Sequence, residues 1–446
     1  MKKLFLSSIA LFLSSMPIYA GGILTNTNQH AAFLRMLARG ASIGIDGVYS
    51  NPAGLSFLPH DGLYLSLTNQ SAYQSRNIDA SFKMYAMNDD RPATTDFQKY
   101  YRGKASAPFI PSIHAAYKQG DWTLSAFLGV TGGGGKASFD EGLPLFSSLM
   151  SALIFKQTAA AGKPLSPQMY DIYTSMNGKQ FIYGLQLGLS YRFNSHLSAF
   201  FGGRMNYFYG GYEGFVKAQL IPSLGGKELA SIKLDCDQTG WGLTPVIGLD
   251  YQTGRWNFAA KYEFKTNMNI ENKTKVLESP DPSLLAPYAD GVNTPSDIPS
   301  LLTVAAGYQI LPTWRVNGEF HFFDDKRAGM ANDKQKALTR GTFEYQVGTE
   351  YDLTKQLTVS GGIQFTDYGL SDDFQSDTSF YCDSYSLGFG AAVKLTTQCT
   401  LNIAYFWTKY QNYVKSSKNY NRTGLPGTDV YSRTNKVFGF SVEYAF

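Results

Sequence analysis

The segment FIYGLQLGLSYRF, residues 181–193, decides the fold of this chain. Its odd-numbered positions hold Phe, Tyr or Leu, and most of its even-numbered positions hold Gly, Gln, Ser or Arg. Because successive side chains of a strand point to opposite faces, this pattern predicts a strand with one apolar and one polar face. The segment is longer than the strands of about five or six residues usual in globular sheets, and it suits a tilted membrane crossing of about 9–11 residues.

Alternation of the same kind occurs along much of the chain after Leu63. Residues 343–351 and 357–365 show it, and so does the end of the chain from Phe438 to Phe446. The chain stops on an aromatic residue and resembles in this the terminal strand that the outer-membrane assembly machinery recognises. We therefore interpret Tyr444 and Phe446 as an assembly signal.

Short turns separate neighbouring strands. With both chain ends on the short-turn side, six short turns require seven long loops, and these thirteen connections join fourteen strands. Short turns on one side and long loops on the other are typical of outer-membrane barrels. We predict an all-β fold, a 14-stranded antiparallel transmembrane β-barrel over residues 62–446 with long extracellular loops. The predicted turns are Gln119-Gly120-Asp121, Asn194-Ser195, Thr253-Gly254, Pro312-Thr313, Thr354-Lys355 and Thr397-Gln398.

The composition suits a barrel with aromatic belts. The chain has 446 residues, with 30 Tyr, 31 Phe and 44 Gly, and only 17% of its residues are charged. Trp122, Trp256 and Trp314 each follow a predicted short turn within a residue or two, where an interfacial aromatic girdle belongs. Core tryptophans are the alternative, but three at equivalent places favour the girdle.

The first residues have the pattern of a secretory signal peptide. Lys2 and Lys3 precede an apolar run from Leu4 to Leu13, and Pro17 to Ala20 form a cleavage site. We expect residues 1–20 to be removed. No later apolar run reaches the length of about 20 residues that a membrane-spanning helix needs.

Residues 21–61 lack the alternation and predict a small plug, or hatch, with short helices. Ala31 to Arg39 are expected to form one helix with Gly40 as its C-cap. In the segment VYSNPAGLSF, residues 48–57, Asn51 can cap a second helix and Pro52 can be its first residue, where a missing N–H costs nothing. A soluble N-terminal tail is the alternative.

The order of these features resembles the FadL/TodX family of outer-membrane transporters of long-chain fatty acids and other hydrophobic compounds. The hatch of that family carries the same triplet, here Asn51, Pro52 and Ala53, and its barrel has the same number of strands. The resemblance implies hatch and gating roles for these three residues. It also implies a route: capture by surface loops, binding in the lumen, passive release gated by the hatch, and lateral diffusion through an opening in strand three.

The longest predicted loop runs from about Gly132 to Lys179. Apolar residues recur in it at helical spacing, which predicts one amphipathic helix outside the barrel and a second over Met169–Met176. Two interpretations stay open, a hydrophobic capture groove and loops that merely pack on one another. The candidate ligand-binding residues of the first helix are Phe146, Leu149, Met150 and Leu153.

Four consecutive glycines close the predicted third strand, within the sequence TGGGGK: Gly132, Gly133, Gly134 and Gly135. Glycines weaken strand pairing and favour a bulge or kink. Their spacing does not fit a phosphate-binding loop. By the resemblance, a kink here opens the wall towards the membrane, and a flexible surface loop is the alternative.

A fatty-acid carboxylate inside a barrel needs a positive partner, because an unpaired buried charge is costly. The resemblance implies basic groups near the ends of strands five and nine. Lys326 and Arg327 are the candidates on strand nine, and Arg204 is the candidate on strand five. The alternative role for these residues is a structural ion pair with an interior glutamate, Glu263, Glu319 or Glu350.

Charge and cysteine usage exclude other classes. The net charge of +4, or +2 without Lys2 and Lys3, does not suggest a nucleic-acid partner. Cys236, Cys382 and Cys399 form no CxxC motif, so we predict no zinc site and no redox motif. We also predict no cofactor, because passive movement of a solute down its gradient needs none. A Cys236–Cys382 disulfide is conceivable, and free buried thiols are the alternative.

No enzyme motif is present. The five histidines lie neither in HExxH nor beside a GxSxG serine: His30, His60, His114, His196 and His321. We predict a non-enzymatic, monomeric channel of the bacterial outer membrane, with a general diffusion porin and a barrel hydrolase as alternatives. Its expected partners are a hydrophobic small molecule, outer-membrane lipid and lipopolysaccharide, and the assembly machinery.

Overall fold

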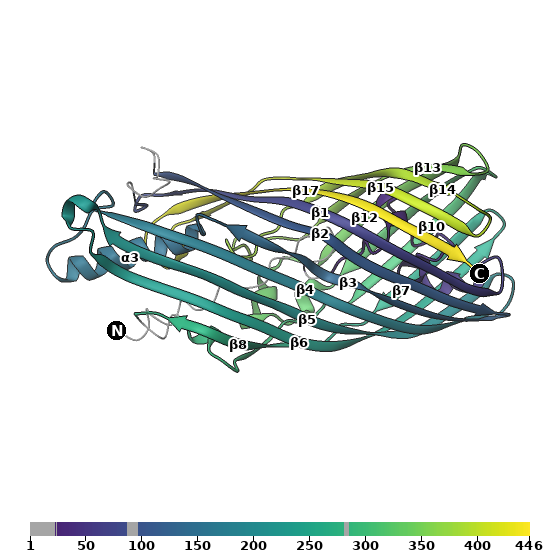
Figure 1. Cartoon of the computed structure of the whole chain (residues 1–446), viewed down its shortest axis with the longest axis horizontal. Coiled ribbons are helices and arrows are strands. Elements are labelled where there is room, and N and C mark those ends of the chain that lie inside the picture. Colours follow the sequence, from purple (N-terminus) through teal and green to yellow (C-terminus); the bar gives the residue numbers. More distant parts are fainter. Residues whose placement is uncertain (1–22, 24, 87–96, 281–284) are drawn as a thin grey trace.

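The chain folds into one closed barrel (Figure 1). The computed structural model describes residues 23, 25–86, 97–280 and 285–446, so the predicted signal peptide lies outside the described residues. The first strand, β1 (Gly62–Phe82), pairs with the last, β17 (Gly427–Ala445), and this pairing closes a ring of antiparallel strands. The predicted all-β barrel of 14 strands is confirmed.

The other barrel strands follow in chain order, each paired with its neighbours: β2 (Gln98–Gln119), β3 (Trp122–Phe139), β4 (Tyr170–Arg192), β5 (Leu197–Leu220), β6 (Glu228–Thr253), β7 (Trp256–Glu263), β10 (Leu301–Leu311), β11 (Trp314–Phe323), β12 (Thr342–Asp352), β13 (Leu357–Asp367), β14 (Ser384–Lys394) and β15 (Cys399–Tyr410). Three more strands belong to long connections: β8 (Asn269–Glu278), β9 (Asn293–Pro295) and β16 (Tyr413–Ser417). None of the described helices is long and apolar enough to cross a membrane.

Short turns and long connections lie at opposite ends of the barrel, which we call the short-turn end and the long-loop end. All six predicted turns join consecutive strands at the short-turn end, where the chain also terminates (Figure 1). Trp122, Trp256 and Trp314 are the first residues of β3, β7 and β11, and all three are exposed. They stand at one level of the outer face, as the predicted girdle requires.

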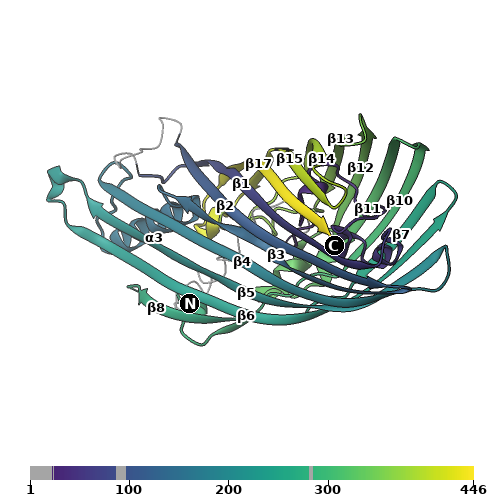
Figure 2. The same ribbon diagram turned by 45° about the vertical axis from the view of Figure 1, so that its right-hand side comes forward.

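The barrel wall is uneven in height. Strands β1 to β6 and β17 have 18 to 26 residues, whereas β7 and β10 to β15 have 8 to 12. The long strands therefore overhang the long-loop end, with helix α3 (Pro144–Ala160) beside them (Figure 2).

The connection between β3 and β4 is shorter than predicted. It covers residues 140–169, because β3 continues to Phe139 and β4 begins at Tyr170. The second predicted helix is wrong, since Ile172 and Met176 are inward-facing residues of β4. Apolar residues four positions apart fit one face of a helix, but they also fit one face of a strand.

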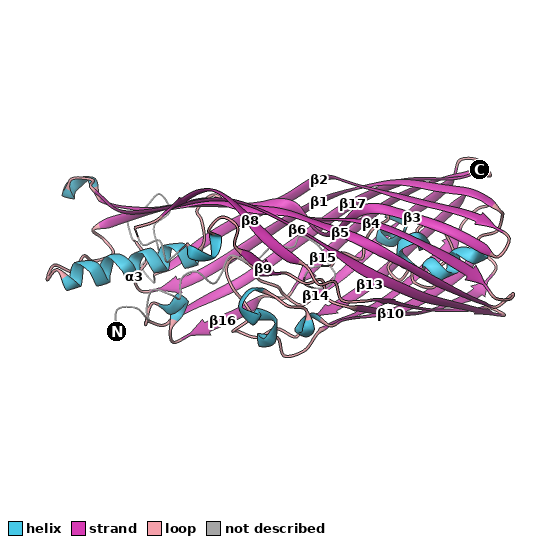
Figure 3. Ribbon diagram, turned by 90° about the horizontal axis from the view of Figure 1, so that it is seen from below, coloured by secondary structure: helices cyan, strands magenta, loops and turns pink. Residues whose placement is uncertain are grey.

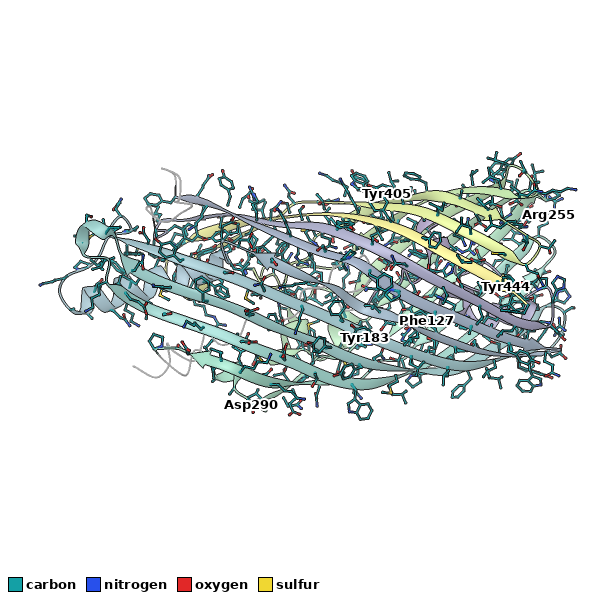
Figure 4. The ribbon with its side chains drawn as sticks, in the orientation of Figure 1. Phe127, Tyr183, Arg255, Asp290, Tyr405 and Tyr444 are labelled. Carbon is teal, nitrogen blue, oxygen red and sulfur yellow. The ribbon has the colours of Figure 1, made fainter. Side chains whose placement is uncertain are left out.

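The outer face is apolar and the interior polar. On β4, Leu185, Leu187 and Leu189 are exposed, whereas Gln186 and Ser190 face inward and are buried. Aromatic side chains such as Tyr183 and Tyr444 stand on the outer face at different heights (Figure 4). An apolar outside with a polar inside is the arrangement of a barrel that crosses lipid.

The hatch lies inside the barrel at the short-turn end (Figure 3). It contains α1 (Ala31–Arg35), α2 (Gly47–Ser50) and the 3-10 helix η1 (Pro52–Phe57). The predicted start of the last helix is correct, because the Asn51 side chain accepts from Gly54 N at 3.2 Å and Pro52 follows it. The helix predicted over Ala31–Arg39 ends earlier, at Arg35, and Met36 is extended.

A row of glycines in the wall explains why α1 stops. Gly348, Gly362 and Gly388 lie directly opposite one another on β12, β13 and β14. A Cβ atom on Gly362 would lie 2.7 Å from Leu37 N, and one on Gly388 would lie 2.3 Å from Leu34 O. The hatch backbone therefore contacts the wall directly at these glycines. A helix continued beyond Arg35 would keep the backbone too far from the wall for this contact.

We predict that Gly348→Val pushes the hatch off the wall while the barrel still forms. A Cβ atom there would overlap Leu37 O, and overpacking of this kind costs about 1–3 kcal/mol. The variant should show faster amide hydrogen exchange over residues 31–40 and higher ion conductance in planar bilayers. Gly318→Val is the matched control, because a Cβ there meets nothing nearer than Gln346 O at 4.0 Å. Equal behaviour of the two variants would contradict this account.

Candidate functional site

An apolar groove lies at the long-loop end, between α3 and the overhanging parts of β5 and β6. All four residues predicted on the helix line it: Phe146, Leu149, Met150 and Leu153. The opposite side of the helix holds Ser147, Ser148 and Ser151, which are buried against the protein. The serine side thus packs and the apolar side faces an open groove, the reverse of an ordinary amphipathic surface helix.

A second pocket lies between Ile23 of the hatch, Phe208 of β5 and the connections at the long-loop end, and we call it the lumenal pocket. Its wall is largely apolar and aromatic, with Ile23 of the hatch, Phe208, Phe374 and Tyr381. Lys334 is the one charged residue among the described residues that line it. Its ammonium donates to Ser376 Oγ at 3.1 Å and stands 5.0 Å from the centre of the Phe374 ring.

The pKa of Lys334 is lowered to about 7, first by burial and then by the nearby charge of Lys415. A negative charge that enters this pocket would raise the pKa of Lys334 again and so favour its protonated form. Sequence reasoning missed Lys334, because it sits in the polar segment ANDKQK, residues 331–336, where nothing distinguishes it from Lys336.

The basic residues selected from the sequence lie elsewhere. Lys326 and Arg327 follow β11 in the 3-10 helix η5 (Asp325–Arg327) and are exposed. The Arg327 guanidinium pairs with Asp324 at 3.2 Å. Arg204 is buried and forms the ion pair with Glu263 that the alternative describes.

The barrel wall has a gap between β2 and β3. Their pairing stops at Ser106 opposite Lys136 and resumes at Ile113 opposite Leu128. Within the gap, β2 contains Pro108 and Pro111, which have no N–H to donate.

The four glycines lie at this gap. They are inside β3 and not at its end, so both the predicted closure of the strand and the surface-loop alternative are wrong. The register between β3 and β4 shifts between Val130 and Gly132 and again between Gly133 and Gly135. Gly133 has a φ of 64°, a conformation that favours glycine. The expected bulge is present, in the part of β3 where its pairing with β2 is interrupted.

The hatch fills the gap from inside. Asn26 donates from its backbone N to Thr131 O and from Nδ2 to Gly133 O, both at 2.8 Å. Gln29 donates from Nε2 to Val130 O at 3.0 Å, and its carbonyl accepts from Ser112 Oγ at 2.8 Å. Residues 26–29 thus replace part of the missing strand pairing. Each such bond contributes about 0.5–1.5 kcal/mol net.

The triplet Asn51, Pro52 and Ala53 is tied to three consecutive strands. Asn51 Nδ2 donates to Asp250 Oδ2 on β6 at 2.6 Å. The carbonyls of Pro52 and Ala53 accept from Ser190 Oγ on β4 and Ser198 Oγ on β5, each at 2.7 Å. The triplet therefore fixes the end of the hatch to the wall.

Buried ion pairs hold the middle of the hatch. Arg39 makes two bonds to Asp46, at 2.8 and 2.9 Å, and also contacts Glu350 of β12 at 3.2 Å. Arg35 pairs with Glu350 as well, and Arg315 of β11 contacts the same carboxylate at 2.7 Å. Burial is the largest single effect on the pKa of Asp46 and would raise it, but the charge and hydrogen bonds of Arg39, together with the charge of Arg35, outweigh burial and lower the pKa.

A serine and a histidine meet inside the barrel without forming a catalytic pair. His30 Nε2 lies 2.8 Å from Ser66 Oγ, and Ala32 N donates to His30 Nδ1 at 3.0 Å. Burial lowers the pKa of His30 to about 4, so the ring is neutral and its proton must be on Nε2. The histidine therefore donates to the serine and cannot remove its proton, as a hydrolase would require.

The cysteines are all free, so the Cys236–Cys382 disulfide is not formed. Over the described ranges, no group of three or more His, Cys, Asp or Glu side chains could hold a metal ion.

The fold matches solved structures of hydrophobic-compound channels. A FadL homologue of Pseudomonas aeruginosa is 14% identical with a TM-score of 0.63, over 96% of this chain and 100% of that chain. The toluene transporter TodX of P. putida is 17% identical with a TM-score of 0.53, over 90% and 94%. The Ralstonia pickettii toluene transporter TbuX is 14% identical with a TM-score of 0.52, over 91% and 94%. At these identities the likeness establishes the fold.

No protein-family model matches the sequence, and no curated protein matches it.

We predict that Glu350→Gln loosens the hatch, because it leaves Arg35 and Arg39 without their shared carboxylate. Removing one partner of a buried ion pair costs about 3–5 kcal/mol, and we expect the free energy of hatch opening to fall by about 3 kcal/mol. Amide hydrogen exchange over residues 31–46 measures it. Asp352→Asn, which affects Arg315 but not the hatch, is the control. Unchanged exchange in Glu350→Gln would show that the ion pairs do not hold the hatch.

Proposed function

We propose that this protein is a channel of the bacterial outer membrane that admits hydrophobic molecules, with long-chain fatty acids as the ligands we expect first. The short-turn end faces the periplasm and the long-loop end faces outside, the orientation usual for outer-membrane barrels. Lipopolysaccharide slows hydrophobic solutes, and a water-filled pore does not help them. Passive movement down a gradient suffices, so the proposal needs no cofactor or energy source.

The groove beside α3 is the proposed capture site. It is apolar, open to the outside, and flanked by the overhanging strands β5 and β6. Exposed apolar surface of this kind often marks a binding site. Phe146, Leu149, Met150 and Leu153 would contact the ligand there.

The lumenal pocket is the proposed second site. An acyl chain would pack on Phe208, Phe374 and Tyr381, and Lys334 would pair with the carboxylate. Arg204, buried against Glu263, would support the wall. Lys326 and Arg327, exposed at the long-loop end, would attract an anionic ligand before it enters.

The observation that carries this proposal is the gap between β2 and β3, closed by the hatch and not by strand pairing. Movement of residues 26–29 would open a path from the lumen sideways into the lipid. Asn51, Pro52 and Ala53 would anchor the end of the hatch during this movement. Gly132, Gly133, Gly134 and Gly135 supply the bend of β3 that keeps the gap open.

The remaining partners follow from the outer surface. Lipid and lipopolysaccharide would contact the apolar outer face, and the assembly machinery would bind the last strand at Tyr444 and Phe446. One closed barrel with its own hatch needs no second copy, so we expect a monomer. A general diffusion porin is disfavoured, because the hatch occupies the lumen.

We predict that cells producing the protein take up labelled oleate or labelled toluene at least severalfold faster than cells without it. Uptake that is unchanged for every hydrophobic solute would end the transport proposal. The double variant Asn26→Ala with Gln29→Ala should speed uptake, because it removes two of the side-chain bonds that seal the gap. Slower or equal uptake by this variant would exclude the gap as the exit.

We predict that Leu149→Asp lowers oleate uptake several-fold at low concentrations and has little effect at high concentrations. The change places a charge in the apolar groove, where capture occurs, but leaves the later steps intact. Initial uptake rates over a range of oleate concentrations measure this. Phe155→Asp, on an exposed part of α3 outside the groove, is the matched control. Equal losses in both variants would exclude the groove as the capture site.

A further inference from the structure

One side of the barrel carries a group of cations on its outer face. Lys104 of β2, Lys136 of β3, Lys409 of β15 and Lys436 of β17 occupy outward positions, where side chains point away from the lumen, and all four are exposed. Their strands, together with β1, are consecutive neighbours around the barrel (Figure 1). We call these four residues the outer lysine cluster.

Strand pairing arranges the outer lysine cluster as two close pairs. Lys409 lies opposite the residue two positions before Lys436 on β17. Lys104 lies opposite the residue two positions after Lys136 on β3. Diagonal neighbours of this kind on one face of a sheet are about 7–8 Å apart, within reach of long side chains. The two ammonium groups of each pair can therefore contact one anion.

The two pairs are separated by a defined distance. Three strand spacings lie between Lys409 and Lys104, and three lie between Lys436 and Lys136. At about 4.8 Å for each spacing, the pairs are about 14 Å apart. Hydroxyl groups, which donate readily to phosphate oxygens, fill the positions between them. The residues that bear these hydroxyls are Tyr73, Ser75, Ser106 and Thr434.

The outer lysine cluster has no carboxylate partner among the described residues. The nearby carboxylates are engaged by other groups. Asp79 pairs with Arg102 of β2, Glu141 accepts from Arg102 N at 3.2 Å, and Asp237 of β6 pairs with Lys179 of β4 at 2.8 Å. On the described outward positions of β15, β17, β1, β2 and β3, Asp79 is the only carboxylate. The cluster is therefore free to bind an anion from outside the protein.

The other sides of the barrel do not share this feature. Among the outward positions of β7 and β10 to β14, all of which are described, Asp367 is the only charged residue, and it pairs with Arg340. On β5 and β6, the first charged outward residues above the apolar surface are acidic, Glu213 and Asp237. An excess of outward cations is thus found on one side only, the side that contains the gap between β2 and β3.

The height of the outer lysine cluster matches the border of the membrane. Ten residues separate Lys436 from the chain end at Phe446. This is about 33 Å along the strand and about 25 Å of height at a tilt of about 40°, equal to the apolar outer band of such barrels. Below Lys436 the outward residues of β17 are apolar or aromatic: Phe438, Phe440, Val442 and Tyr444. In the proposed orientation, the cluster lies level with the head groups of the outer leaflet.

We propose that the outer lysine cluster binds one molecule of lipid A, the anchor of lipopolysaccharide, with one phosphate at each lysine pair. Lipid A carries a phosphate at each end of a disaccharide, so two separated cationic sites suit it, whereas a phospholipid with one phosphate would occupy one pair only. Clusters of cations at a membrane surface attract anionic head groups. This proposal goes beyond the proposed function and uses only its orientation of the barrel.

The position of the bound lipid relates it to the gap between β2 and β3. The gap begins directly below the pairing of Ser106 with Lys136. The acyl chains of a lipid held by Lys104 and Lys136 therefore lie over the gap from outside, and the hatch closes the same gap from inside.

The test measures lipid binding to the full mature chain by native mass spectrometry from detergent micelles. The probes are lipid A with two phosphates, lipid A with one phosphate and lipid A without phosphate. We expect one bound molecule of the two-phosphate form per chain, and an affinity at least tenfold lower for each phosphate removed. Two lysines contact each phosphate, and each lysine near a membrane surface typically contributes about fivefold.

The double variant Lys104→Gln with Lys136→Gln removes one pair. It should bind lipid A with two phosphates no more tightly than lipid A with one, because a single phosphate site remains. Replacing all four lysines of the cluster with glutamine should make the three probes bind equally. The matched control removes the same charge from outward lysines of β5, β6 and β8 and should bind like the unaltered protein: Lys217→Gln, Lys233→Gln, Lys273→Gln and Lys275→Gln.

Equal binding of the three probes to the unaltered protein would overturn the proposal, and so would equal losses in the fourfold cluster variant and in the control. A double variant that still prefers two phosphates to one would also overturn it. Oleate uptake by cells tests the proposed function separately. Uptake by a protein that does not distinguish the probes would overturn the lipid site and leave the channel in place.

Discussion

A strand that crosses lipid must satisfy its backbone hydrogen bonds within the protein, because the bilayer core supplies no partners. At the gap between β2 and β3 the barrel does not meet this requirement with strands alone. Asn26 and Gln29 of the hatch donate to the carbonyls of β3 instead. The wall and the plug are therefore one structure, and neither is complete without the other.

The part of the hatch from Leu34 to Asp46 is held by two kinds of contact with different physical character. The first kind is close van der Waals packing, because glycines of β12, β13 and β14 let the hatch backbone lie against the wall. The second kind is the group of buried ion pairs between Glu350 and its arginine partners, which require a defined geometry. The first fixes how closely the hatch approaches, and the second fixes its register. Residues 26–29, by contrast, contact the wall through hydrogen bonds between uncharged groups.

The parts of the fold that depend on local pattern could be predicted from sequence. Alternation, short turns and the Asn51-Pro52 helix start are read from neighbouring residues, and these predictions were correct. Predictions were wrong where the residues show no alternation of apolar and polar side chains, or where the spacing of apolar residues fits both a helix and a strand. Gly132 to Gly135 carry no side chains to alternate, so the end of β3 was placed too early. Ile172 and Met176 fit both a helix and a strand.

The groove residues were found from sequence because they share one face of a helix, but the pocket residues were not. Lys334 gains its position from contacts with Phe374 and with Ser376, which lies 42 residues later in the chain. The end of α1 depends in the same way on Gly348, Gly362 and Gly388, more than three hundred residues later. Information of this kind is not present in any single segment.

The unequal height of the wall has a consequence for where a solute first meets the protein. Strand β6 has 26 residues, which at about 3.3 Å per residue is a length of about 85 Å along the strand, well beyond a bilayer crossing. Together with β4 and β5, strand β6 forms a side of the barrel that extends beyond the short strands of the opposite side. In the proposed orientation, these long strands would project through the sugar layer of the cell surface. Hydrophobic molecules would then first bind the protein at the outer surface of the sugar layer. From there they would diffuse along the inner face of the long strands to the membrane.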